Sequence, residues 1–165
     1  MKKTLLTVTQ VTVGRLALVD KYSLDNTDAR VKELRKVERL FKRTYSVDTK
    51  VVYIDSKDKA LIAKSTTKGF RCSMTSKVVV FLTDDIVENA QTLLHELTHV
   101  YQATHMTAKF KASKKEYLLG KVVYRNSWHE RHARGCSNRL IQEYMSNKRF
   151  TTIIDKAPAY KVVAV

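Results

Sequence analysis

A run of apolar, mostly β-branched residues followed at once by a helical pattern constrains the fold of this chain more than any other stretch. The run VVVFL lies within Lys77 to Thr83, and residues of this kind favour a buried strand. Asp84-Asp85 forms a short turn, after which we expect a helix from about Ile86 to Ala103. A strand that leads directly into a helix indicates a sheet packed against that helix.

Other periodic segments predict further helices and strands. Thr27 is a suitable N-cap for a helix that runs to Tyr45, in which apolar residues recur at helical spacing. The remaining expected elements are strands in the first 19 residues with a turn at Gly14-Arg15, strands at Val51 to Asp55 and around Phe70, Cys72 and Met74, and a helix from about Trp128 to Asn147. The basic segment KFKASKKEYLLGKVVY has no assigned state, and the last fifteen residues are expected to be extended.

The length and composition fit one domain. The 165 residues correspond to about one domain, and with 44% hydrophobic residues they can form an ordinary core. No Gly-, Ser- or Pro-rich linker divides the chain. We therefore predict a single α+β domain over residues 1–165, with a small mixed β-sheet packed on the helix from Ile86, on the N-terminal basic helix and on the C-terminal helix.

Cysteine usage and hydropathy favour a reduced, soluble protein. Cys72 and Cys136 lack the spacing of a zinc ribbon or a redox site, so we expect them to be reduced and structural. Gln10 and Arg15 interrupt the apolar run near the N-terminus, which argues against a secretory signal. No stretch reaches the roughly 18 apolar residues of a membrane span, and we expect a cytoplasmic protein without a membrane partner.

The predicted helix from Ile86 contains the pattern His-Glu-x-x-His. At about 100° per residue, positions four apart differ by about 40°, so His95 and His99 project from one face and can bind one metal ion. Neutral imidazoles suit zinc, and a three-ligand site with an open position lowers the pKa of a bound water to about 7. Glu96 lies beside the two histidines, where it can take a proton from that water and pass it to a leaving amine.

This helix resembles the active-site helix of the zincin superfamily of metallopeptidases. The resemblance covers the His95 to His99 motif, the strand before it and, more weakly, a later helix. It implies a minimal zincin-like fold and zinc-dependent hydrolysis of a protein or peptide substrate, with Glu96 as general base. It also implies that an edge strand holds the substrate, and Val78 to Leu82 is a candidate for that strand or for its central neighbour.

The third ligand decides the subfamily that the resemblance implies. Gluzincin-like enzymes take a glutamate from a downstream helix, often with a small residue three positions later. The segment Glu130-Arg131-His132-Ala133 fits this pattern. Helical geometry agrees independently, because Glu130 lies about 60° from the middle of the apolar stripe on its helix and so projects toward the core.

Histidines compete with Glu130 for this position. His129 lies about 40° on the other side of the same stripe and can be a ligand or support one, whereas His132 points away and is expected to be solvated. His105 has the spacing of the metzincin signature, but Gln102 replaces the glycine that lets the chain turn back, so the helix is expected to continue. We predict that His95, His99 and Glu130 bind Zn²⁺, with His129 and His105 as the alternative third ligands.

The residue that stabilises the oxyanion of a tetrahedral intermediate is left open. Zincins commonly use a Tyr, His or Arg for this purpose, in addition to the metal. The candidates are Tyr124, Arg125, His129 and Tyr144.

A large excess of positive charge supports a second hypothesis. The chain has 31 Lys and Arg against 16 Asp and Glu, a formal net charge of +15. The helix from Thr27 to Tyr45 and the segment from Lys109 to Lys121 are the most basic stretches. Such surfaces attract nucleic acid or acidic proteins in a salt-sensitive way. The alternative function is therefore a basic nucleic-acid- or acidic-protein-binding protein with a structural or vestigial zinc site.

Overall fold

The computed structural model describes residues 17–63, 66–73, 75–162 and 164. Within them the protein is an α+β fold with a small mixed sheet, which confirms the predicted class. Of the first 19 residues, in which strands are expected, residues 1–16 lie outside the described part of the chain. Residues 17–21 are helical, so the strand prediction is wrong for positions 17–19, where Val19 is buried against one face of the sheet.

The described sheet has the strand order β1-β3-β2. Strand β1 (Val51–Asp55) runs parallel to β3 (Val78–Leu82), and β2 (Gly69–Arg71) pairs antiparallel to β3. The VVVFL run is therefore the central strand and is buried at every position. Strand β2 ends at Arg71, sooner than predicted, and the Cys72 amide donates to the Lys77 carbonyl at 2.8 Å just before the chain turns back into β3. Met74 lies outside the described residues.

The helices largely follow the predicted pattern. They are α2 (Ala29–Tyr45), α3 (Ile86–His105), α4 (Thr107–Leu118) and α5 (Trp128–Asn147), with 3₁₀ turns η1 (Ser56–Leu61), η2 (Tyr124–Asn126) and η3 (Ile154–Lys156). Helix α5 has the predicted bounds. The basic segment to which the sequence assigns no secondary structure is mainly helix α4. In the C-terminal segment, which the sequence predicts to be extended, η3 forms a short helical turn.

Helix α2 begins one residue later than predicted, with Asp28 and not Thr27 as its N-cap. The Asp28 carboxylate accepts a hydrogen bond from the Arg30 amide at 2.9 Å. The Thr27 hydroxyl donates instead to the Asp25 carboxylate at 2.5 Å. Asp28 is favoured because its carboxylate is also bound by the guanidinium of Arg30, at 2.8 Å.

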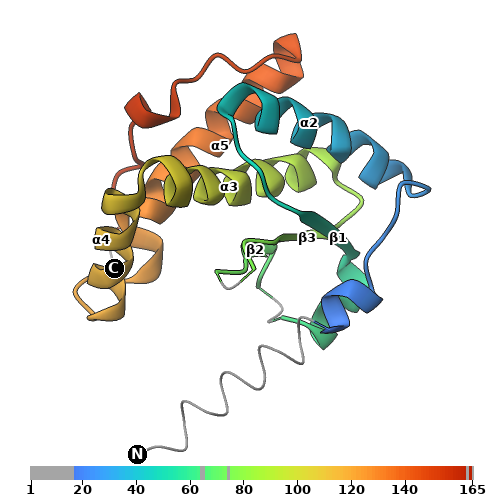
Figure 1. Cartoon of the computed structure of the whole chain (residues 1–165), viewed down its shortest axis with the longest axis horizontal. Coiled ribbons are helices and arrows are strands. Elements are labelled where there is room, and N and C mark those ends of the chain that lie inside the picture. The colour runs from blue at the N-terminus through green and yellow to red at the C-terminus, as the bar shows by residue number, and fades with distance from the viewer. Residues whose placement is uncertain (1–16, 64–65, 74, 163, 165) are drawn as a thin grey trace, which may run out of the picture.

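The three longest helices lie on one side of the sheet (Figure 1). Because side chains alternate along a strand, each β-strand faces two different clusters. Val78, Val80 and Leu82 of β3 pack with apolar residues of α2, α3 and α5 in the larger core. Val79 and Phe81 face the other side, where the helical residues 17–21 and the segment after η1 cover them. Helix α3 thus lies between the sheet and α5.

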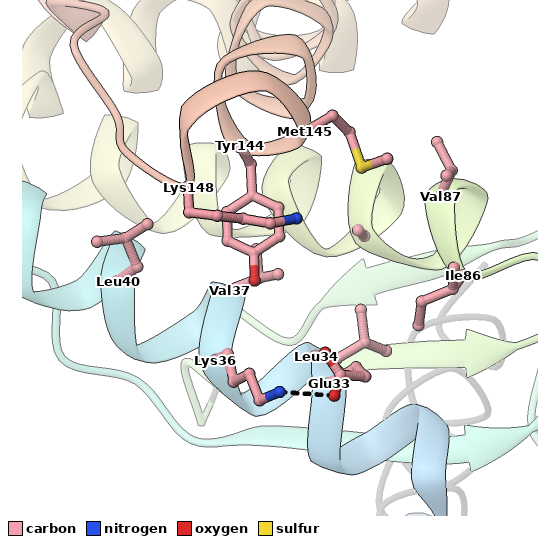
Figure 2. Close-up of a pocket in the computed structure, with 11 residues that line it drawn as sticks. Glu33, Leu34, Lys36, Val37, Leu40, Ile86, Val87, Tyr144, Met145 and Lys148 are labelled. Carbon is pink, nitrogen blue, oxygen red and sulfur yellow. Dashed lines mark hydrogen bonds and ion pairs between the residues drawn. The ribbon is translucent and has the colours of Figure 1, made fainter.

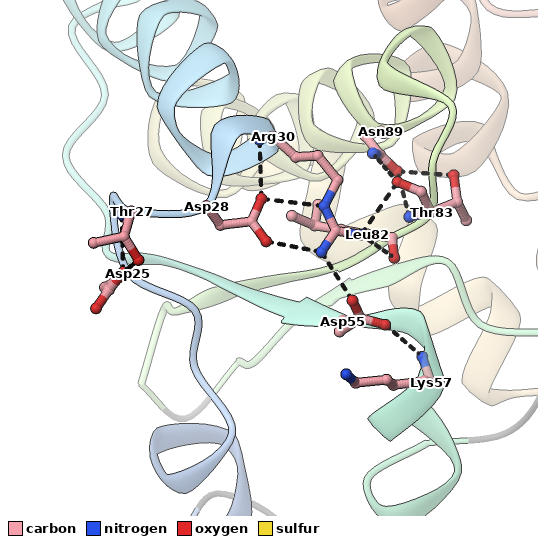
Figure 3. Close-up of polar contacts among 9 residues, drawn as sticks. All are labelled: Asp25, Thr27, Asp28, Arg30, Asp55, Lys57, Leu82, Thr83 and Asn89. Carbon is pink, nitrogen blue, oxygen red and sulfur yellow. Dashed lines mark hydrogen bonds and ion pairs between the residues drawn. The ribbon is translucent and has the colours of Figure 1, made fainter.

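Arg30 fastens the start of α2 to the ends of two strands (Figure 3). Its guanidinium bridges Asp28 and Asp55, the last residue of β1, both at 2.8 Å. The same group donates to the Leu82 carbonyl at the end of β3, at 3.4 Å. Since β1 and β3 are parallel, their carboxyl ends meet here, and the start of α3 follows directly.

An apolar groove of 590 Å³ lies between α2, the start of α3 and the end of α5 (Figure 2). Leu34 and Val37 form its α2 side, and Tyr144 and Met145 form its α5 side. It contains no histidine or cysteine. The groove is therefore a gap in helix packing without metal-binding side chains of these two types.

Two predictions from composition concern these elements. Cys72 and Cys136 are both buried, as expected for structural thiols. Among the described residues, no helix combines the length and the apolar character that crossing a bilayer requires.

Candidate metal site

Helix α3 places two histidines side by side. Asp85 caps the helix by accepting hydrogen bonds from the amides of Val87 and Glu88, which fixes where its turns begin. One turn apart on this helix, His95 and His99 have their Nε2 atoms 3.1 Å from each other. The spacing of the motif therefore brings the two imidazoles onto one face, as predicted.

Glu130 on α5 completes the cluster. Its Oε1 lies 2.8 Å from the Nε2 of His99, and its Oε2 lies 3.3 Å from the Nε2 of His95. One ligand atom from each of the three residues falls within a group no wider than 4.8 Å. The predicted ligands thus converge in a pocket where Glu130 is only 6% exposed.

The polar atoms of this cluster fit a bound cation. Glu130 Oε1 is buried and makes no hydrogen bond of acceptable geometry, despite the short distance to His99 Nε2. Burial by itself raises the pKa of Glu130, but the positive charge that His95 and His99 carry when protonated outweighs burial and holds that pKa well below its usual range. An ionised carboxylate and two imidazoles around one point form the donor set that suits zinc.

Gln102 sets which nitrogen of His99 can bind a metal. The side-chain amide of Gln102 donates to the His129 carbonyl at 3.0 Å, and a carbonyl can only accept. The Gln102 oxygen therefore faces the Nδ1 of His99, 2.9 Å away, and accepts its proton. Neutral His99 then keeps a lone pair on Nε2, directed at Glu130 and His95.

The same amide continues the network to His132. The second proton of the Gln102 amide points to the His132 Nδ1 at 2.9 Å, so His132 carries its own proton on Nε2. That Nε2 donates to the Ile154 carbonyl at 2.9 Å. The expectation that His132 is solvated is wrong, because the C-terminal segment around η3 covers this side of α5 and leaves His132 1% exposed.

The two alternative third ligands lie outside the cluster. His105 is exposed at the end of α3, where its Nε2 lies 3.1 Å from the Ser46 carbonyl. Helix α3 does continue through Gln102, as predicted from the missing glycine. The ring of His129 lies 5.8 Å from that of His99, and its Nδ1 is 2.8 Å from the Ser113 hydroxyl. Burial is the main cause that lowers the pKa of His129 to about 4.

Glu96 lies beside the cluster without joining it. Its side chain is 8% exposed, and burial raises the pKa of its carboxyl group to about 7, with His99 opposing the shift and Glu130 adding to it. Edge strand β2 approaches this side chain closely: a Cβ at Gly69 would lie 3.3 Å from the Glu96 Cγ. Glycine at this position leaves room for both Glu96 and Thr92 under the strand.

Two cavities open onto the cluster. The larger, of 680 Å³, is lined by His95, Glu130 and the α3 residue Thr92, and the smaller, of 140 Å³, is lined by His99 and His129. Gly69, Phe70, Glu96 and Tyr124 line both. Among the four oxyanion candidates, Tyr124 is therefore the one that borders both cavities, and burial together with Glu130 holds its pKa well above the usual range. Tyr144 lines the separate apolar groove, and Arg125 lines neither cavity.

Comparisons with protein-family models, with curated proteins and with solved structures found no match to this chain. The chemistry of the site is therefore inferred from its geometry: a cluster on two helices that could hold a metal ion, a carboxylate beside it, and a cleft bordered by an edge strand.

The sequence assigned no role at the metal cluster to two residues of this region, Gln102 and Arg71. Gln102 lies three positions after His99, on the same side of the helix, and a buried amide there signals a partner for the ring. Arg71, the last residue of β2, gave no such signal, because a basic residue at the end of a strand is ordinarily solvated.

Proposed function

We propose that the protein is a zinc-dependent peptidase that hydrolyses peptide bonds in the cleft beside β2. The observation that carries the proposal is the convergence of His95, His99 and Glu130 on one buried point, with Glu130 Oε1 left without a hydrogen bond. A second carboxylate, Glu96, borders the same cleft. This combination of ligands, open cleft and adjacent base supports hydrolysis better than a purely structural zinc.

Each residue has a distinct part in the proposed reaction. His95, His99 and Glu130 would hold a zinc ion, and its Lewis acidity would polarise the scissile carbonyl and make a water acidic at neutral pH. Glu96 takes a proton from that water on its carboxylate and passes it to the leaving amine. The side-chain oxygen of Gln102 accepts the Nδ1 proton of His99, which leaves the Nε2 of His99 free for a metal ion. The Tyr124 hydroxyl, which stays protonated, can donate a hydrogen bond to the oxyanion.

Strand β2 offers a backbone edge for an extended substrate. The Phe81 amide donates to the Lys68 carbonyl, and the Cys72 amide donates to the Lys77 carbonyl. These two contacts show which residue pairs of the antiparallel ladder are hydrogen-bonded. Because bonded and non-bonded pairs alternate, the amides and carbonyls of Gly69 and Arg71 point to the outer edge. A peptide that adds to this edge runs past Glu96. In this proposal β2 is the edge strand that holds the substrate, and β3 (Val78–Leu82) is the central strand beside it.

The first test is the metal content of purified protein, measured by elemental analysis without chelators. We expect one zinc per chain, lost in Glu130→Ala and retained in the matched control His105→Ala. Loss of zinc in His105→Ala alone contradicts the ligand assignment. Absence of zinc from all three proteins removes the basis of the proposal.

The second test is hydrolysis of a mixture of internally quenched random peptides by the zinc-loaded protein. Glu96→Gln is expected to abolish hydrolysis while zinc stays bound. Glu116→Gln, at an exposed position on α4, is the matched control and should match the wild type. Hydrolysis by Glu96→Gln at the wild-type rate contradicts the role of Glu96 as general base.

The alternative, binding of nucleic acid or acidic proteins, is favoured by the lysines of α4. On α2, Arg30, Arg35, Lys36 and Lys42 form ion pairs within the protein. The α4 cations Lys109, Lys111, Lys114 and Lys115 have no carboxylate within 4.0 Å among the described residues. Retention on immobilised double-stranded DNA that falls with added salt supports this second function, and its absence at low salt contradicts it.

A further inference from the structure

Arg71 on edge strand β2 is an unsatisfied cation close to the metal cluster. Its side chain is partly buried, and its Nε is shielded from solvent without a hydrogen-bond partner. No carboxylate of the described residues lies within 4.0 Å of its guanidinium. Burial lowers the pKa of Arg71, with only partial compensation from the charges of Cys72 and Glu96. A buried guanidinium donor of this kind can be satisfied by an anionic ligand.

The strand geometry directs this side chain toward α3 and α4. Along β2, Gly69 and Arg71 share a face, since successive residues alternate. The Cβ direction of Gly69 meets Thr92 and Glu96 of α3, which identifies that face. The Arg71 Cζ accordingly lies 5.8 Å from the centre of the Phe110 ring on α4.

A second cation shares the same ring. The Nζ of Lys114 lies 5.5 Å from the centre of the Phe110 ring. Two like charges near one aromatic ring, with no carboxylate of the described residues in ion-pair distance of either, repel each other. A bound anion between them removes this repulsion and provides the acceptor that Arg71 Nε lacks.

The space between these groups has the size of a small acid group. Arg71 and Lys114 line the 140 Å³ cavity together with Phe110, Glu96 and His99. A water molecule in the liquid takes about 30 Å³, so the cavity has room for a carboxylate and its attached carbon. Because Glu96 and His99 line the same cavity, an anion held there lies beside the proposed scissile bond.

We propose that Arg71 and Lys114 form a subsite for a carboxylate of the peptide substrate, next to the metal cluster. The proposal rests on the peptidase function above and names its substrate class: peptides with an acidic side chain, or a free C-terminal carboxylate, adjacent to the cleaved bond. Arg71 supplies a fork of donors that matches a carboxylate, and Lys114 supplies a second charge.

The experiment follows the Nε–H signal of Arg71 by NMR, assigned with the variant Arg71→Lys, while small probes are added. N-acetyl-aspartate N-methylamide represents an acidic side chain and N-acetylalanine a C-terminal carboxylate. N-acetyl-asparagine N-methylamide and N-acetylalanine amide are their neutral counterparts. We expect a saturable shift with at least one acidic probe and none with its neutral counterpart. The probe that binds more tightly identifies the source of the carboxylate.

Matched lysine variants on α4 test the second cation. Lys114→Met is expected to weaken binding of the acidic probe roughly tenfold, the loss of about one charge-assisted contact. Lys115→Met, its exposed neighbour, is expected to leave binding within twofold of the wild type. Absence of a saturable shift with either acid, equal binding of acid and neutral probes, or equal losses in the two variants overturns the proposal.

Zinc content measured on the same samples separates the two proposals. Carboxylate binding at Arg71 without any zinc leaves the anion subsite standing and removes the peptidase. If the protein contains zinc and hydrolyses peptides but does not bind the carboxylate probes, the peptidase proposal stands and the anion subsite is removed.

Discussion

Replacing Gln102 tests whether the hydrogen-bond network behind His99 tunes metal binding. The side chain is fully buried and connects three groups: the Nδ1 of His99, the Nδ1 of His132 and the carbonyl of His129. Gln102→Met keeps a side chain of similar length but supplies neither donor nor acceptor. Gln102→Glu keeps the acceptor for His99 and removes the two donors.

The structure sets the size of both effects. Each buried polar group left unpaired costs about 1–3 kcal/mol, so the two imidazole nitrogens that lose their partner destabilise Gln102→Met by roughly 2–5 kcal/mol. Loss of a hydrogen bond behind a metal-binding histidine lowers metal affinity about 10–100-fold. Gln102→Glu should lose a similar amount of stability, yet bind zinc at least as tightly as the wild type, because a carboxylate makes the His99 ring a stronger ligand.

Two assays resolve these expectations. Zinc affinity is measured by competition with a chromophoric chelator, and the free energy of unfolding by urea titration of the metal-free protein. Gln142→Met, at an exposed position on α5, is the matched control and should change neither quantity. Equal zinc affinity in Gln102→Met and the wild type, or equal losses of affinity in Gln102→Met and Gln102→Glu, would refute the reasoning.

Two further perturbations address the edge strand and the ends of the parallel strands. Gly69→Ala places a Cβ 2.9 Å from both the Thr92 Cγ2 and the Val79 carbonyl oxygen, so urea titration should show a loss of about 1–3 kcal/mol, and unchanged stability contradicts this tight approach. Arg30→Met should lower the free energy of unfolding by about 2 kcal/mol at pH 7. Since Arg30 lowers the pKa of Asp28 and Asp55, its contribution is present above about pH 4 and is lost as the pH falls through their folded-state pKa values, so the wild type and variant should converge in acid. A difference that persists when both aspartates are protonated argues against this linkage.

The parts of the site that the sequence predicts correctly depend on periodicity. His95 and His99 share a face because they are one turn apart, and Glu130 projects toward the core because of its angle to the apolar stripe on α5. These angles are properties of a single helix. Packing α5 against α3 at the observed register then brings the three side chains together.

The parts that the sequence misses depend on contacts between segments far apart in the chain. His132 lies on a face of α5 that looks solvent-exposed until the C-terminal segment covers it. Gly135 allows this approach, because a Cβ there would lie 2.5 Å from the Pro158 carbonyl oxygen. Helix α4 gives no periodic signal, since Phe110 and Ser113 are the buried residues among its described positions.

The hydrogen-bond network joins the metal cluster to the last part of the described chain. From His99 it passes through Gln102 and His132 to the Ile154 carbonyl in η3, and the Tyr101 hydroxyl, also from α3, donates to Asp155 at 2.6 Å. If η3 leaves α5, His132 loses its acceptor and no longer has a fixed tautomer. Gln102 then loses one of the partners that hold its oxygen toward His99. Because linkage is reciprocal, a metal ion bound at His99 would also stabilise the docked position of η3. The C-terminal segment is thus part of the support of the metal site, although it contributes no ligand to the cluster.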